Sequence, residues 1–250
     1  GSEMCIRDRF ANIAHGCNSV AATRAAMKLA DYAITEAGFG SDLGAEKFFN
    51  IKCRAAGFAP AAVVIVTSTK ALKWHGGVPL PEIGSPNLEA VERGIVNLDA
   101  HIANLKQFGP NIVVALNHFH TDTEAEIEVI RARCAELGVR FAVSDGFAKG
   151  GEGAEALARE VVAAAEDFHP LVHTYEADAP IVDKLNAIVT KVYGGSGVKL
   201  APAALKDLKR IEELGFGKLP VCVAKTPFSL TDDPKALGCL LYTSDAAADE

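Results

Sequence analysis

The sequence predicts an α/β protein with parallel or mixed sheets and helices on both faces. Two continuous apolar runs, AAVVIVTS at 61–68 and NIVVALN at 111–117, have the length and character of strands that are buried on both sides. Helical patterns follow such runs repeatedly, as in βαβ units. The 250 residues are 49% hydrophobic and 23% charged, which is a globular composition with enough chain for one large or two modest cores.

The elements follow from periodicity, capping residues and apolar runs. Helices are predicted over 17–30, from Ser41 or Asp42 to about 53, and over 89–108, 124–137, 152–167, 180–192 and 202–214. Strands are predicted over 31–36, 61–68, 111–117, 139–145 and 219–226. A Gly/Pro-rich loop occupies 76–88, and a break near 105–110 separates two α/β units.

Charge and hydropathy exclude several classes of protein. The formal net charge is -7 without a basic block, so a nucleic-acid partner is not expected. No run approaches 18 apolar residues, and no apolar segment follows the N-terminal charges, so neither a membrane span nor a secretory signal is predicted. The cysteines are scattered without a C-x-x-C pair, which favours reduced thiols and a cytoplasmic location.

The first loop of interest, TEAGFGSDLGAEKF at 35–48, follows a predicted strand and opens a helix. Ligands bind open parallel sheets beyond the carboxyl ends of the strands. Glycine N–H groups and the helix dipole at this point suit an anion. The spacing is not G-x-G-x-x-G, and a tight turn with a helix cap explains the same residues.

Two further loops follow the predicted strands. In NHFHTDTEAE at 117–126, Asp122 or Thr123 is the expected helix cap, and His118 and His120 lack the spacing of a helical zinc pair, so no metal site is predicted. In SDGFAKGGEG at 144–153, Phe147 is either a core plug or a stacking platform for a planar ligand.

Nucleotide and hydrolase motifs are absent from the sequence. It contains no G-x-x-x-x-G-K-[ST], no G-x-S-x-G and no H-E-x-x-H, and the lookalike GFGKL at 215–219 lacks the spacing and the hydroxyl of a P-loop. Motifs alone therefore leave the chemistry undecided.

Distinctive strings nevertheless resemble the formate–tetrahydrofolate ligases, in family order from 10 to 238. They are FANIAHGCNSV (10–20), TEAGFGSDLGAEKFFNIKCR (35–54), ALKWHGG (71–77), FHTDTEAEI (119–127), KGGEG (149–153), IEELGFGKLPVCVAKT (211–226) and SLTDDPKALG (229–238). The resemblance implies a P-loop NTPase-like family fold and an ATP-dependent ligase of one-carbon metabolism. Formate, ATP with Mg²⁺, and tetrahydrofolate would be its ligands, and the parent protein would be a homotetramer.

The resemblance also implies the chemistry. Formate attacks the γ-phosphate of ATP to give formyl phosphate, and the folate amine then takes the formyl group. Such a reaction needs cations and backbone donors around a phosphoryl group. It also needs a flat slot for the pterin.

For folate binding the resemblance points to Phe119 and Phe147 as the rings that sandwich the pterin, with Gly150 and Gly151 after the second ring. Phe147 stands where the family usually has tryptophan, so stacking area and an indole N–H are lost. Lys70 is expected to bind phosphate or formate and replaces a frequent arginine, which weakens a bidentate contact.

For formate and phosphate the resemblance points to the first loop and to the NIAHG string. The expected catalytic residues are Asn12, His15, Glu36 and Asp42, with Gly38 and Gly40 as backbone donors. A capping role is the alternative for His15. Lys225, Thr226 and Asp232 are weaker candidates for the nucleotide side.

The ends of the chain do not continue its patterns. GSEMCIRDR at 1–9 and the residues at 239–250 look like adapter-derived tails, so we expect an internal fragment whose P-loop and C-terminal end lie elsewhere. The expected organisation is the C-terminal part of a nucleotide- and formate-binding domain at 10–108 and a second unit with the folate loops at 109–238. The alternatives are a non-catalytic folate-binding module and a generic α/β nucleotide-binding protein.

Overall fold

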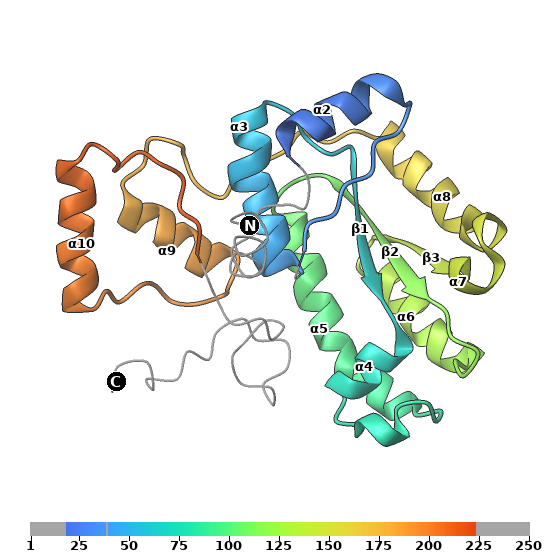
Figure 1. Cartoon of the computed structure of the whole chain (residues 1–250). Helices are drawn as coiled ribbons and strands as arrows, with labels where there is room; N and C mark the ends of the chain where they lie inside the picture. Colours follow the sequence, from blue (N-terminus) through green and yellow to red (C-terminus); the bar gives the residue numbers. More distant parts are fainter. Residues whose placement is uncertain (1–18, 39, 224–250) are drawn as a thin grey trace, which may run out of the picture. The chain divides into compact units, whose positions relative to one another are not determined.

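The computed structural model describes residues 19–38 and 40–223 (Figure 1). The chain divides into two compact units. The first unit combines Gly1–Ala59 with Val172–Glu250, and the second spans Pro60–Leu171. The division expected at 108/109 falls inside the second unit, in the connection from a helix to a strand.

The second unit contains a three-stranded parallel sheet in the order β1-β2-β3. Its strands are β1 (Ala62–Thr67), β2 (Asn111–Asn117) and β3 (Arg140–Ser144). The register pairs Val66 with Ala115 and Leu116 with Val143, so the three strands end at the same edge. The parallel sheet predicted from the apolar runs is confirmed for these three strands.

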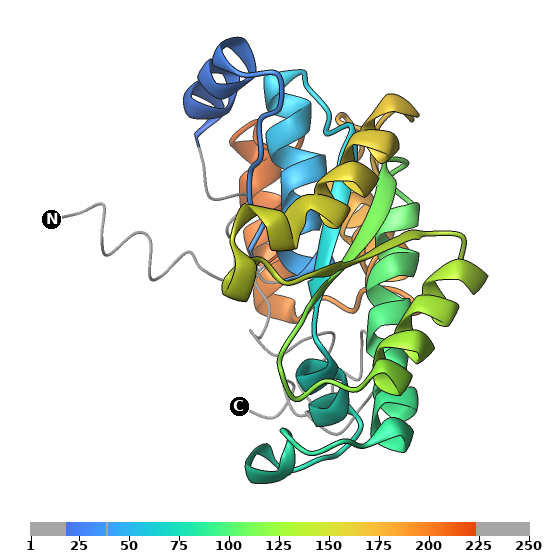
Figure 2. The same ribbon diagram turned by 90° about the vertical axis from the view of Figure 1, so that its right-hand side faces the viewer.

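Helices cover both faces of this sheet, as predicted. The helices of this unit are α4 (Thr69–His75), the short 3₁₀ helix η4 (Leu80–Glu82), α5 (Leu88–Lys106), α6 (Glu124–Glu136), α7 (Gly146–Lys149) and α8 (Gly151–Glu166). Helices α5 and α6 lie on one face, and α8 lies on the other (Figure 2). Strand β2 runs between these layers, and Val113, Val114 and Leu116 are inaccessible to solvent.

Side-chain caps fix where α4 and α6 begin. Ser68 accepts a hydrogen bond from the N–H of Ala71 and so starts α4 directly after β1. Thr123, rather than Asp122, caps α6 and forms a reciprocal capping box with Glu126. Asp122 is thereby available for other contacts.

The described part of the first unit is helical. Its elements are α2 (Val20–Leu29), η2 (Ser41–Ala45), η3 (Phe48–Cys53), α3 (Arg54–Ala56), α9 (Ile181–Lys191) and α10 (Pro202–Glu213). Residues 41–56 form one continuous helical run with two π-helical stretches, η2 and η3. Across the described ranges, no helix is both long and apolar enough to span a bilayer.

Three strand predictions are wrong in part. Residues 31–36 form no strand, and Ile34 is 93% exposed, because no described strand pairs with this segment. Residues 219–223 are likewise irregular, while 224–226 lie outside the described part. Strand β1, an edge strand of the described sheet, is not buried on both faces, because Val64 and Val66, which share one face, are exposed.

A buried ion pair joins α4 to α6 in the second unit. The side chains of Lys73 and Glu126 are buried, and Lys73 Nζ lies 3.2 Å from Glu126 Oε1. Burial alone would raise the pKa of Glu126, but hydrogen bonds from the backbone N–H groups of Asn87 and Thr123, and from Thr123 Oγ1 and Lys73, hold that pKa below its ordinary 4.5. The pair therefore fastens the loop before α5 as well as both helices.

We expect Glu126→Gln to lower the free energy of unfolding by about 3 kcal/mol near neutral pH, because it leaves the Lys73 ammonium buried without its counter-charge. Since the folded-state pKa is depressed, the difference from wild type is full above pH 4.5 and shrinks as pH falls through the lowered value. Urea unfolding against pH measures it. Glu128→Gln is the control, as this exposed residue pairs only at the surface with Arg131. Equal effects of the two variants would contradict the prediction.

Candidate active site

Parallel pairing gathers three loops at one edge of the sheet in the second unit. Residues 68–70 follow β1, residues 118–123 follow β2, and residues 145–153 follow β3. This is the edge at which parallel sheets bind ligands. Lys70, Phe119, Phe147, Gly150 and Gly151 all belong to these loops or to the helices that start there.

The first two loops are joined by a cation–π contact. The Nζ of Lys70 lies 4.0 Å from the centroid of the Phe119 ring. Phe119 is 38% exposed, so its ring is half-buried against the protein rather than free in solvent. The contact brings together two residues that the sequence had assigned to different ligands.

Asp122 connects the same two loops through its carboxylate. Thr69 Oγ1 donates to Asp122 Oδ1, and the backbone N–H of Phe119 donates to Asp122 Oδ2 at 2.9 Å. Sequence reasoning considered Asp122 only as a helix cap, because nothing in its spacing reveals a partner 53 residues away.

The second and third loops are joined by a polar cluster around Asp145. His118 Nδ1 lies 3.4 Å from Asp145 Oδ1, and Lys149 Nζ lies 2.8 Å from Asp145 Oδ2. The hydrogen bond from Lys149, followed by that from His118, lowers the pKa of Asp145, and the carboxylate raises the pKa of Lys149. The N–H of His118 also donates to the carbonyl of Ser144 at 3.0 Å.

Phe147 lies on α7 and is fully exposed, so it is not a core plug. The turn beneath it depends on glycine. Gly150 joins α7 to α8 with φ 59° and ψ -138°, a conformation that side chains disfavour. A Cβ at Gly153 would lie 2.3 Å from the carbonyl oxygen of Asp145, whereas one at Gly151 would meet nothing within 4 Å.

In the first unit, the segment that ends at Gly40, here called the glycine loop, packs on the start of the 41–56 helical run. A Cβ at Gly44 would lie 1.8 Å from the carbonyl oxygen of Gly38, so the loop backbone lies directly against the first helical turn. Gly40 precedes that turn with φ 95°. Glu36 is exposed, but Asp42 is 1% exposed, so the two carboxylates do not share one open surface.

A buried polar group of this unit was not singled out from the sequence. Glu46 accepts a hydrogen bond from Asn50 Nδ2 at 2.8 Å, and the same amide donates to Thr174 Oγ1 at 2.7 Å. Burial raises the pKa of Glu46. Burial also raises the pKa of the Tyr193 hydroxyl, and the nearby carboxylates of Glu46 and Asp42 raise it further. The only sequence signal was that Glu46 lies within the 35–54 string. π-Helical turns such as those on either side of it are frequent at functional sites.

The candidate residues therefore form two sets in separate units. Glu36, Gly38, Gly40 and Asp42 belong to the first unit, and the five residues of the strand-end loops belong to the second. Five further candidates lie outside the described residues: Asn12, His15, Lys225, Thr226 and Asp232.

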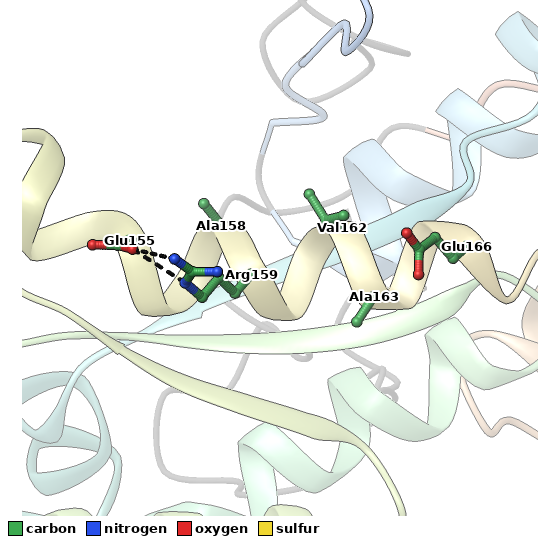
Figure 3. Close-up of a pocket in the computed structure, with 6 residues that line it drawn as sticks. All are labelled: Glu155, Ala158, Arg159, Val162, Ala163 and Glu166. Carbon is green, nitrogen blue, oxygen red and sulfur yellow. Dashed lines mark hydrogen bonds and ion pairs between the residues drawn. The ribbon is translucent and has the colours of Figure 1, made fainter.

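A shallow hollow on α8 is a different feature (Figure 3). It is lined by Glu155, Ala158, Arg159, Val162, Ala163 and Glu166. Its polar groups are surface residues of one helix, and Arg159 pairs with Glu155 of the same helix. Because no polar groups from other elements converge on it, we do not take it as the functional site.

The chain matches a known protein family. The model of the formate–tetrahydrofolate ligase family matches residues 7–241. The match includes the glycine loop, the three strand-end loops and all of the candidate site residues.

We expect Gly150→Ala to lower the free energy of unfolding by about 1–3 kcal/mol, because alanine is strained at this positive φ. Gly151→Ala is the matched control and should change it by less than about 1 kcal/mol, since its Cβ enters open space. Chemical denaturation of both variants measures the difference. Equal destabilisation would show that the turn does not depend on the conformation of Gly150.

Proposed function

Because the chain belongs to the formate–tetrahydrofolate ligase family, we propose that the strand-end loops of its second unit bind tetrahydrofolate. Members of this family are ATP-dependent ligases that join formate to tetrahydrofolate. The observation that carries the proposal is the pair of solvent-accessible aromatic rings, Phe119 and Phe147, on neighbouring loops at the carboxyl edge of the sheet.

The proposed folate site combines planar stacking with fixed loops. The pterin stacks against Phe119, whose backbone is held by Asp122, and against Phe147 on α7. Aromatic pairs contribute about 0.5–1.5 kcal/mol beyond the apolar area they bury. Gly150 and Gly151 keep side chains away from the turn next to the second ring.

We assign formate and the transferred phosphate to the glycine loop of the first unit. Its helical run begins at Ser41 after Gly40, and the first N–H groups of a helix lack intrahelical partners and favour anions. Glu36 and Asp42, with Asn12 and His15 outside the described residues, are proposed as the catalytic side chains. In the second unit, Lys70 is proposed to bind phosphate or formate, because its ammonium keeps its N–H donors when it lies over the Phe119 ring.

The proposed reaction has two steps. A formate oxygen attacks the γ-phosphorus of ATP and ADP leaves, which gives formyl phosphate. The folate amine then attacks the formyl carbon, inorganic phosphate leaves, and the amine loses its proton, which gives 10-formyltetrahydrofolate. Backbone N–H groups suit both steps because negative charge develops on phosphoryl and carbonyl oxygens.

The remaining expectations concern ATP and assembly. Lys225, Thr226 and Asp232 are proposed for the nucleotide side, and a homotetramer in the cytoplasm is proposed for the parent protein. Residues 19–38 and 40–223 contain no group of three or more carboxylate, imidazole or thiol side chains that would hold a metal ion.

Removing either ring tests the folate site. We expect Phe119→Ala and Phe147→Ala each to weaken tetrahydrofolate binding by about 3–10-fold, the loss of one stacking partner. We expect Phe147→Trp to strengthen it, because the indole offers a larger face. Isothermal titration of the 250-residue chain with tetrahydrofolate measures each affinity.

Phe168→Ala is the matched control, since Phe168 is an exposed aromatic residue of the same unit that follows the other end of α8. Unchanged affinity in both site variants, or an equal loss in the control, would contradict the folate assignment.

Ligation itself is a separate prediction. We expect the 250-residue chain alone to form no 10-formyltetrahydrofolate from formate, ATP and tetrahydrofolate, because its sequence has no P-loop to hold the triphosphate. A spectrophotometric assay of the purified chain measures this. Product above background would overturn the prediction. Tetrahydrofolate binding without turnover is what both a ligase chain without a P-loop and a non-catalytic folate module predict.

A further inference from the structure

We propose that Asp122 is a positioning residue that holds the Phe119 ring beneath the Lys70 ammonium, so that only the opposite face of the ring receives a planar ligand. The proposal rests on the folate site proposed above. Asp122 is free for this task because the adjacent Thr123 supplies the cap of α6.

The geometry around Asp122 fixes the backbone of Phe119 from two directions. The N–H of Phe119 donates to Asp122 Oδ2 at 2.9 Å, and the N–H of Asp122 donates back to the carbonyl of Phe119 at 2.9 Å. These reciprocal bonds close the turn after β2. The backbone that carries the ring is therefore determined by the side chain three residues later.

The second carboxylate oxygen ties this turn to the neighbouring strand. Asp122 Oδ1 accepts a hydrogen bond from the hydroxyl of Thr69, the first residue of α4 after β1. Lys70 is the next residue of that helix, and its Nζ lies 4.0 Å from the Phe119 ring centroid. One carboxylate thus sets the positions of both members of the cation–π pair.

A second polar contact lies one helical turn further along and keeps the helices together independently. Lys73 follows Thr69 by four residues, and its partner Glu126 follows Asp122 by four residues. Because this buried ion pair fastens α4 to α6, loss of Asp122 should loosen the turn at Phe119 without unfolding the unit. Because the Lys73–Glu126 ion pair keeps the two helices together, an effect of Asp122 on ligand binding can be measured in a folded protein.

Lys70 restricts which face of the ring a ligand can use. An ammonium at this distance occupies one face of Phe119, and 38% of the residue remains exposed. A pterin stacked on the remaining face has a cation on the far side of the ring. The order of contacts is then cation, ring, pterin.

The test compares Asp122→Asn, Thr69→Val and Thr69→Ser in the 250-residue chain. An amide at 122 offers one acceptor oxygen to two donors, so we expect Asp122→Asn to weaken tetrahydrofolate binding about fivefold and Thr69→Val about threefold. Thr69→Ser keeps the hydroxyl and should stay within about twofold of wild type. The urea midpoints should change little for all three.

A ligand-free readout accompanies the titrations. The ring current of Phe119 should shift the Lys70 ε-methylene proton resonances upfield in wild type. In Asp122→Asn and Thr69→Val they should move toward the values of an exposed lysine such as Lys206, and in Thr69→Ser they should not. If Asp122→Asn does not fold, the two Thr69 variants decide the question.

Combination with Phe119→Ala separates the possible failures. In that background, Asp122→Asn should have no further effect on affinity, because the ring it positions is gone. Additive losses, or Lys70 resonances that do not respond to the Asp122 and Thr69 variants, would overturn the positioning role. If Phe119→Ala and Phe147→Ala both leave affinity unchanged while the resonances respond as expected, the folate assignment fails and the positioning role stands.

Discussion

The parallel pairing of β1, β2 and β3 is the constraint on which the candidate folate site depends. Because the strands run in the same direction and in register, the residues that follow them emerge at one edge of the sheet. Thr69, Asp122 and Asp145 then lie close enough to make contacts between loops that are far apart in the sequence. An antiparallel arrangement of the same strands would send neighbouring loops to opposite ends.

Hydrogen bonds and ion pairs, rather than apolar packing, hold the strand-end loops in place. The strand-end loops carry few buried apolar side chains, and their order comes from carboxylates that each bind two partners: Asp122 binds Thr69 and Phe119, and Asp145 binds His118 and Lys149. Charge-assisted hydrogen bonds are stronger and more directional than neutral ones. Such loops can expose an aromatic ring to solvent and still hold the backbone that carries it.

The sequence predicted the layers of the second unit well because each layer has its own periodic signal. The apolar runs at 61–68 and 111–117 and the capped helix at 124–137 correspond to β1, β2 and α6. Prediction failed where structure depends on distant partners. The segment at 31–36 has strand-like residues but no described strand beside it, and Asp122 carries no local sign of its contact with Thr69. The buried Glu46 was missed for a related reason, since its partner Asn50 is itself bonded to Thr174, which lies far along the chain.

The two rings of the proposed folate site differ in how much order they have before a ligand arrives. Phe119 has a backbone held by Asp122, and one face of its ring lies beneath Lys70. Phe147 is fully exposed on a four-residue helix that is held by Asp145 through Lys149 and by the turn at Gly150. Ordering a side chain on binding costs conformational entropy, so the preorganised ring contributes more of its contact energy to affinity. In the proposed site, Phe119 is therefore the fixed platform, and Phe147 is the ring that becomes ordered when the pterin is bound.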